Sequence, residues 1–175
     1  MNNLKGTNIL LRALEPSDLQ IIYRWENDVS AWHESGNLVP ISEFTVENYI
    51  GTQDDIFSSK QLKLIIEKDK KAIGHIDLFE FEPSNKRAGV GILIDEKERN
   101  NGYASEALGL IIKYAFKLLR LRQLYCNIIV DNEKSINLIK KHGFVINGTR
   151  KDWVLIGDGW KDVYFLQLIK DEKDI

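Results

Sequence analysis

Residues 95–107 read DEKERNNGYASEA and decide more about the fold than any other stretch of this chain. They follow an apolar, strand-like run, residues 89–94, and open a strongly periodic helix. The first N–H groups of a helix lack partners within it and lie at the positive end of its dipole, so they can receive phosphate oxygens. Arg99 adds a fixed positive charge, and Gly102 has no side chain to hold a pyrophosphate away from the backbone. The alternative is a plain helix start, because any tight turn can use glycine.

The composition is that of a soluble globular domain. Of the 175 residues, 43% are apolar and 29% are charged, which excludes a disordered chain. The net charge of −2 argues against a nucleic-acid partner. Cys126 is the single cysteine and lies in an apolar run, so we expect a small core residue rather than a catalytic thiol, and no metal site. The N-terminus lacks an apolar signal core and nothing reaches membrane-spanning length, which predicts a cytoplasmic protein without a membrane partner.

The hydrophobic pattern predicts one mixed α+β domain, residues 1–175, with its core at about 7–170. The 27–44 segment is irregular, and a long loop of this kind is often functional. Thr45 is expected to cap a short helix, and Gly143 to end another. The expected strands are 9–14, 62–66, 72–79, 90–94, 124–130, 144–146, 153–156 and 163–169, and the expected helices are 16–26, 45–50, 103–120 and 133–141.

Three motifs resemble those of the GNAT N-acetyltransferases. Arg99–Ala104 is similar to the family's Gln/Arg-x-x-Gly-x-Gly/Ala signature, the loop that holds the pyrophosphate of acetyl-CoA. Asn132–Ser135, followed by His142–Phe144, is similar to the family's Asn-x-x-Ala/Ser helix that ends in Gly-Phe. Phe81–Ala88 resembles the loop between the third and fourth strands in ribosomal-protein N-terminal and spermidine acetyltransferases. The matches follow the family order and span Leu11 to about Ile169.

The resemblance implies a GNAT-like fold and acetyl-CoA as the cofactor. The implied fold is a mixed, mostly antiparallel sheet of about seven strands, with helices on both faces and a splay between strands 4 and 5. In the family, that splay exposes backbone groups that bind pantetheine and the carbonyl oxygen. The implied cofactor contacts are Ile92, Leu93, Ile94, Arg99, Asn100, Asn101, Gly102, Tyr103, Ala104, Ser105, Asn132 and Ser135.

Amide formation from a thioester needs a deprotonated amine, a stabilised carbonyl oxygen and a departing thiolate. Many relatives supply the leaving-group acid from a Tyr seven residues after the motif Asn, where this chain has Ile139. Ribosomal-protein-type relatives also lack that Tyr, and a Ser matching Ser135 is the proposed acid there. Ser135 is therefore our candidate acid; the alternative is a hydroxyl that only helps the helix start or contacts the cofactor.

The general base is less clearly marked. Relatives place a Glu on the fourth strand, where this chain has Gly89, or on the penultimate strand, where it has Val154. Glu80 aligns with an acidic residue of the spermidine enzymes, and strand alternation predicts that it shares a face with the apolar residues before it. We rank Glu80 first and Asp152 second, while Asp77 also lies near the right strands. An ordinary rim carboxylate is the alternative for each.

We expect the acceptor site in the 27–44 loop and the 157–160 hairpin. Aromatic and acidic side chains there can bind a cationic amine by cation–π contact and charge; the alternative is that the aromatics fill the core and the acids are solvated. His33, in the same loop, is expected to be a surface histidine rather than a base. The candidate acceptor residues are Glu26, Asp28, Trp32, Glu34 and Trp160.

The sequence thus predicts an acetyl-CoA-dependent N-acetyltransferase that acts on a primary amine by direct attack in a ternary complex. The acceptors that we expect first are a protein N-terminus and a small polyamine, followed by an antibiotic or an amino sugar. A homodimer is a further possibility. A non-catalytic acyl-CoA-binding module is the rival, because the usual Tyr and carboxylates are absent. A phosphate-loop nucleotidase is a weaker rival, because the loop lacks the Gly-Lys-Ser/Thr ending that a triphosphate and magnesium need.

Overall fold

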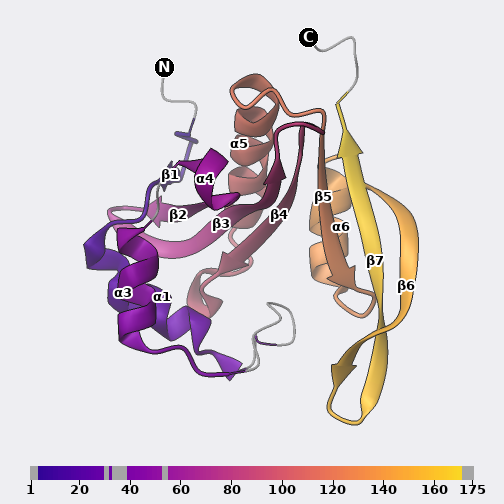
Figure 1. Ribbon diagram of the computed structural model, residues 1–175, viewed down its shortest axis with the longest axis horizontal. Coiled ribbons are helices and arrows are strands. Elements are labelled where there is room, and N and C mark those ends of the chain that lie inside the picture. Colours follow the sequence, from indigo (N-terminus) through magenta and orange to yellow (C-terminus); the bar gives the residue numbers. More distant parts are fainter. Residues whose placement is uncertain (1–3, 30–31, 33–38, 53–54, 171–175) are drawn as a thin grey trace.

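The computed structural model describes residues 4–29, 32, 39–52 and 55–170. In this part of the chain, one sheet of seven strands has the order β1-β2-β3-β4-β5-β7-β6 (Figure 1). Neighbouring strands are antiparallel except β4 and β5, which are parallel. The predicted fold class is confirmed. The elements are β1 (Leu10–Arg12), η1 (Pro16–Asp18), α1 (Leu19–Glu26), α3 (Glu43–Gly51), α4 (Ile56–Ser59), β2 (Leu62–Lys68), β3 (Lys71–Glu82), β4 (Arg87–Ile94), η3 (Glu96–Glu98), α5 (Tyr103–Lys117), β5 (Gln123–Ile129), α6 (Glu133–Lys141), β6 (Val145–Ile156) and β7 (Gly159–Ile169).

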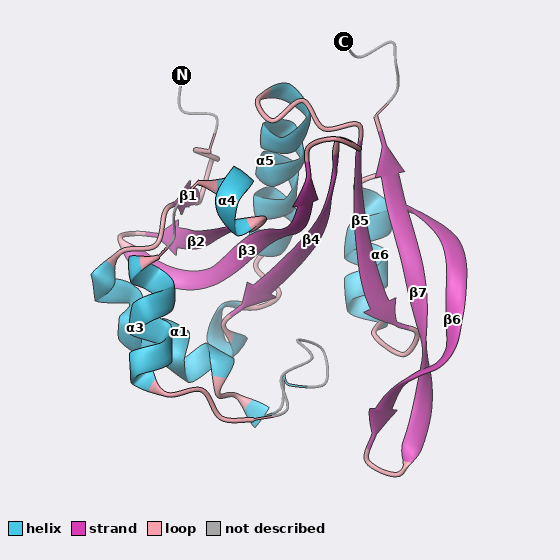
Figure 2. Ribbon diagram, in the orientation of Figure 1, coloured by secondary structure: helices cyan, strands magenta, loops and turns pink. Residues whose placement is uncertain are grey.

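Helices cover both faces of the sheet (Figure 2). α5 and α6 pack on one face, over alternate residues of β2 to β5 and β7. α1 and α3 pack on the other face over β2 to β4, around Ile22, Trp25, Val46 and Ile65. The face under α1 and α3, which also carries Lys63, Asp77 and Gly91, is called the α1 face below. No helix of the described residues is long and apolar enough to cross a membrane.

Helix α5 follows the predicted periodicity. Ala107, Leu108, Ile111 and Ala115 are all fully buried on one side of it. The helix was predicted to extend to residue 120, but it ends at Lys117, and Leu118, which caps it, is 51% exposed.

Three helix boundaries can be compared with the prediction. The cap of α3 is Ser42, whose hydroxyl oxygen accepts from the Thr45 N–H at 3.1 Å, so Thr45 is not the cap. α4 was not predicted; Asp55 caps it by accepting from two backbone N–H groups. Gly143 follows α6 with φ of 89°, as predicted for a residue that ends a helix.

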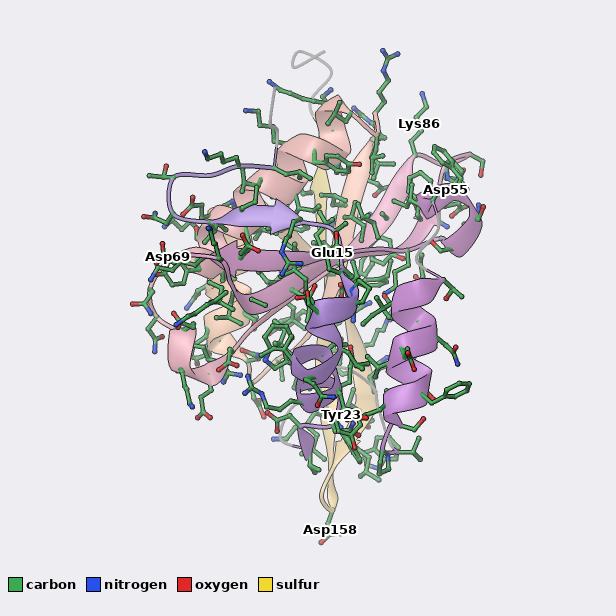
Figure 3. All side chains as sticks on the ribbon, turned by 90° about the vertical axis from the view of Figure 1, so that its left-hand side faces the viewer. Glu15, Tyr23, Asp55, Asp69, Lys86 and Asp158 are labelled. Atoms are coloured by element: carbon green, nitrogen blue, oxygen red, sulfur yellow. The ribbon has the colours of Figure 1, made fainter. Side chains whose placement is uncertain are left out.

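Strand β6 is continuous where two short strands were predicted. Its pairing with β7 shifts register between Ile146 and Gly148 and again between Arg150 and Val154. Such bulges insert an extra residue without ending the strand, which explains why the apolar alternation breaks while the pairing continues. The β6–β7 hairpin projects beyond the body of the molecule, with Asp158 at its tip and Lys86 in the β3–β4 turn at the opposite end (Figure 3).

Candidate active site

Strands β4 and β5 separate partway along their length. Their last paired residues are Gly89 and Tyr125. Beyond this point residues 90–94 remain bonded to β3 and residues 126–129 to β7, so the strand edges that face each other lack strand partners. We call the gap between these two segments the β4–β5 opening (Figure 1). A cavity of about 170 Å³ occupies it, lined by Val90, Gly91, Ile92, Cys126, Asn127, Ile128, Ile129, Asn132, Ser135, Leu138 and Ile139.

The loop that the sequence singled out closes the end of β4. The Arg99 Nε donates to the Ile94 carbonyl at 3.1 Å, and the Asn101 amide donates to two carbonyls of the same turn. Asn100 and Gly102 both have positive φ, 65° and 82°. This geometry bends the chain sharply from strand to helix and aims the helix start outward.

Backbone N–H groups of residues 103–105 form the first turn of α5. The first N–H to bond back into the helix is that of Glu106, which donates to the Gly102 carbonyl at 3.1 Å. The N–H groups before it are therefore available at the positive end of the helix dipole. The arrangement is suited to a phosphate or pyrophosphate group.

The start of α6 forms the opposite wall of the opening. The Asn132 side chain caps the helix by accepting from the Ser135 N–H at 3.1 Å. Ser135 and Ile139, one turn apart on this helix, both line the cavity. Ile139 thus places an apolar side chain at the position of the Tyr that was described above as the leaving-group acid. Ser135 places a hydroxyl group of α6 at the cavity.

Cys126 also lines the opening. Its side chain is 4% exposed, which confirms the predicted core position. Burial raises the pKa of the Cys126 thiol to about 12, so the group stays a neutral thiol near pH 7. A thiol in this state is a poor nucleophile.

Glu80 lies on the opposite face from the one predicted. A bulge between Phe79 and Glu82, with φ of 48° at Glu80, interrupts the alternation of β3 and gives the inward place to Phe81. Glu80 is exposed and accepts a hydrogen bond from the Tyr125 hydroxyl. Burial and the neighbouring Glu80 raise the pKa of Tyr125. The Glu80–Tyr125 pair therefore stands at the head of the β4–β5 opening.

Gly89 explains why a glutamate at the usual β4 position is absent. A Cβ at Gly89 would lie 2.2 Å from the ring of Phe79, which packs edge-on against Tyr125 with ring centroids 6.0 Å apart. Any side chain there would displace this ring. Asp152, the second-ranked candidate, is exposed on the edge strand β6, with β7 between it and β5. The structure does not bring Asp152 to the opening.

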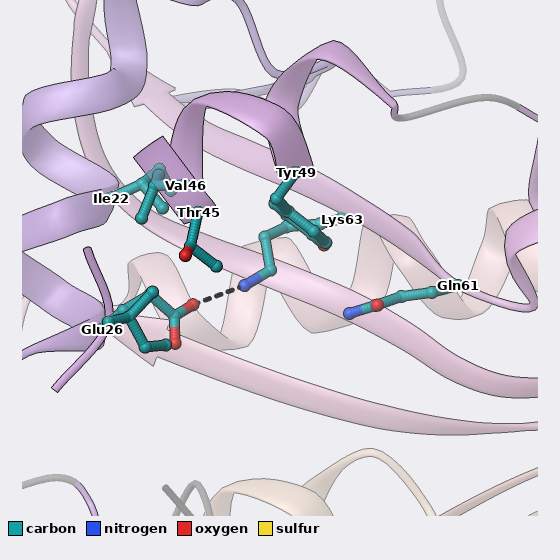
Figure 4. A pocket seen from close by; sticks show the side chains of 8 residues that line it. Ile22, Glu26, Thr45, Val46, Tyr49, Gln61 and Lys63 are labelled. Carbon is teal, nitrogen blue, oxygen red and sulfur yellow. Dashed lines mark hydrogen bonds and ion pairs between the residues drawn. The ribbon is translucent and has the colours of Figure 1, made fainter. Parts of the chain in front are cut away.

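Only part of the predicted acceptor set comes together. Glu26 forms an ion pair with the buried Lys63 at 2.7 Å and faces a cavity of about 230 Å³ between α1, α3 and β2 (Figure 4). The Trp32 Nε1 donates to the Glu26 carbonyl at 3.0 Å, and Asp28 is exposed nearby in the chain. Trp160 is 60% exposed on the β6–β7 hairpin, across the opening from α1 (Figure 1). His33 and Glu34 lie outside the described residues.

A polar cluster on the α1 face surrounds Asp77, for which the sequence predicted neither His75 nor Lys63 as a partner. Asp77 lies 3.3 Å from the Nδ1 of His75 and opposite Lys63 in the adjacent strand. Burial favours a raised pKa for Asp77, but the charges of His75 and Lys63 outweigh it and hold the pKa below its ordinary value. The signal was present: His75 and Asp77 alternate with buried apolar residues in β3, which places both polar groups on one face.

Comparison with known proteins agrees with this geometry. A family model described as an acetyltransferase (GNAT) domain matches residues 8–145. The spermidine N(1)-acetyltransferase of Escherichia coli K12 is 29% identical over 144 residues, which cover 81% of this chain and 75% of that protein. The E. coli ribosomal-protein-serine acetyltransferase is 30% identical over 109 residues, which cover 62% and 61%. The crystal structure of spermidine N-acetyltransferase from Vibrio cholerae in complex with CoA and spermine has a TM-score of 0.86 at 24% identity, covering 94% of this chain and 96% of that one.

Proposed function

The chain belongs to the acetyltransferase (GNAT) family and is an N-acetyltransferase that uses acetyl-CoA, and we propose that its acceptor is a primary amine with more than one positive charge. One observation carries the proposal. Two carboxylates of β3 lie on the α1 face beside the point where β4 leaves β5: Asp77 opposite Gly91, and Glu80 at the hydroxyl of Tyr125. An acceptor that reaches the opening from this face therefore meets negative charge.

The proposed cofactor position follows the opening. The pyrophosphate binds the N–H groups of residues 100–105, with Arg99 adding charge. Pantetheine, an extended chain with two amide groups, lies along the backbone of residues 92–94, where the strand edge has no strand partner. Asn132 and Ser135 approach the sulfur from α6. The low reactivity expected of the Cys126 thiol supports direct attack of the amine on the thioester rather than an acyl-cysteine intermediate.

The proposed acceptor position combines rings and carboxylates. The rings of Phe79 and Tyr125 offer an apolar surface for methylene groups and a π face for an ammonium group. Glu80 is exposed beside them and attracts a second ammonium group. A polyamine has this alternation of charge and methylene, and relatives of this chain include a spermidine acetyltransferase. A protein N-terminus is the competing acceptor, because another relative is a ribosomal-protein-serine acetyltransferase.

An acceptor panel tests the proposal. The purified protein is mixed with acetyl-CoA and spermidine, spermine, butylamine or a short peptide with a free N-terminal serine, and release of CoA thiol is followed. We expect kcat/KM for spermidine to exceed that for butylamine at least about tenfold, or roughly 1.4 kcal/mol in transition-state stabilisation. Equal values for the two amines, or a preference for the peptide, would overturn the polyamine assignment.

A further inference from the structure

We propose that Asp77 holds the attacking nitrogen of the acceptor and takes its proton as the amide bond forms. The inference rests on the proposed function, because it needs an amine that approaches β4 from the α1 face. It assigns the proton transfer to a residue other than Glu80, Asp152 and Ser135.

The position of Asp77 follows from strand register. Lys63 of β2, Asp77 of β3 and Gly91 of β4 form one row of directly paired residues on the α1 face. Gly91 is the next member of the row and itself lines the β4–β5 opening. A Cβ built on Gly91 would meet the edge of the Phe79 ring at 3.7 Å, and because glycine has no side chain, position 91 places no side chain between the carboxylate and the opening. Asp77 is thus the one carboxylate of this row, and it is paired directly with a residue that lines the opening.

One oxygen of the Asp77 carboxylate accepts no hydrogen bond from the described residues. The Asp77 side chain is 16% exposed, and Oδ2 lies 3.3 Å from the His75 Nδ1. Its Oδ1 is buried and has no hydrogen-bond partner among the described residues. A buried carboxylate oxygen without a donor is rare and costs stability, so it calls for an explanation. The N–H of a bound amine is a donor of the right kind.

The surrounding charges favour a cation at this position. The groups that face Asp77 and its neighbour Lys63 are His75 from β3, Glu26 from α1 and Tyr49 from α3, while β4 contributes the uncharged Gly91. Two carboxylates and one ammonium group leave the cluster with one net negative charge when His75 is neutral and with no net charge when His75 is protonated, so its net charge is positive in neither state. The charges of His75 and Lys63 keep Asp77 ionised, and Glu26 partly offsets the charge of Lys63.

Every bond, electron pair and proton is accounted for in the proposed step. The lone pair of the neutral amine forms the C–N bond, and the carbonyl π pair moves to oxygen. The nitrogen becomes positive and therefore far more acidic, so Asp77 Oδ1 can take its proton although the carboxylate is a weak base towards a free ammonium ion. The C=O bond re-forms, the C–S bond breaks and the CoA thiolate leaves. The proton on Asp77 then passes to water, which regenerates the carboxylate, and the thiolate takes a proton from water or from the Ser135 hydroxyl, which regains it from water, so the products are the amide and free CoA.

The decisive variant is Asp77→Asn. The amide keeps the shape and can still accept an N–H, but it cannot take a proton, and Lys63 retains Glu26 as its partner. We expect kcat with spermidine to fall about 10²–10⁴-fold, with a much smaller change in the KM for acetyl-CoA. Asp77→Glu should recover part of the loss. The control is Asp18→Asn, which alters a carboxylate that is less exposed still, 5% against 16%, and is bonded to Arg12 of the edge strand β1, three strands away from β4.

Weakly basic nucleophiles separate chemistry from structure. After attack, hydrazine or hydroxylamine loses a proton to water more easily than spermidine does, so the deficit of Asp77→Asn should shrink with them. A merely structural role would give the same loss for every nucleophile, and this result would overturn the inference. A folded Asp77→Asn protein with at least roughly a third of the wild-type kcat and an unchanged pH profile would also overturn it. Absence of acetylation by the wild-type protein with any polyamine would instead overturn the proposed function.

Discussion

Replacing Gly102 by valine should weaken acetyl-CoA binding while leaving the protein folded. Gly102 precedes α5 with φ of 82°, and a Cβ built there meets no atom within 4 Å beyond its chain neighbours. The left-handed backbone costs an L-residue about 1–2 kcal/mol, which lowers Tm by about 2–8 °C in a domain of this size. Because the space around this Cβ is empty of protein, the new side chain stands where we place the pyrophosphate. We expect at least about tenfold weaker binding, or about 1.4 kcal/mol.

Gly157→Val is the matched control. Gly157 has φ of 59° and equally empty surroundings, but it lies in the β6–β7 turn. The two variants should lose similar stability in thermal unfolding, whereas calorimetry should show weaker acetyl-CoA binding only for Gly102→Val. Wild-type affinity should also fall with added salt, because the bound phosphates are charged. Wild-type affinity in a folded Gly102→Val protein, or equal weakening in both variants, would refute the phosphate-loop assignment.

Three further changes test the walls of the site. Ser135→Ala should lower turnover at saturating acetyl-CoA by about 10²–10⁴-fold if the hydroxyl protonates the thiolate, and a loss under roughly threefold would reduce Ser135 to a helix-start residue. Glu26→Gln should lower the free energy of unfolding in urea by about 1–3 kcal/mol, because it removes the carboxylate bonded to Lys63, 7% exposed, and leaves Asp77 of β3 as the remaining carboxylate beside it; no loss would show that the pair is not stabilising. Burial, and after it the charge of Lys141, lowers the pKa of His142. The unfolded chain therefore binds a proton at a pH where the folded chain does not, so the free energy of unfolding should fall as the pH drops through the ordinary histidine range. His142→Gln should flatten that part of the stability profile, and an unchanged slope would assign it to other groups.

The strand–turn–helix segment at the end of β4 could be predicted because the interactions that shape it are local. A strand that ends at Ile94, a turn with positive φ at Gly102 and a helix that begins at Tyr103 lie within one short segment. The hydrogen bonds that shape the turn, from Arg99 and Asn101, also stay within that segment. Glycine and helix-start signals in the sequence are therefore sufficient to predict this turn, and the motif resemblance indicates the family.

The catalytic side could not be predicted in the same way. Glu80 lies on the opposite face of the sheet from the one predicted because a bulge with positive φ interrupts β3, and no residue type in this part of the sequence predicts that bulge. Glu26, a candidate for amine binding, forms an ion pair with Lys63 of β2, which the sequence did not predict. These outcomes depend on which strand residues oppose each other, and a shift by one residue reverses every side chain beyond it.

The sequence by itself determined the strand–turn–helix segment from β4 to α5 and the buried face of α5, because both follow from backbone preferences or apolar spacing within a few turns of chain, and its motifs indicated the family. Only the tertiary structure decided where β4 and β5 part, at Gly89 and Tyr125, and that Lys63, Asp77 and Gly91 form one row beside that opening. Those three residues come from three different strands. Their alignment depends on pairing register and on burial under α1 and α3, which are properties of the packed sheet and not of any one segment.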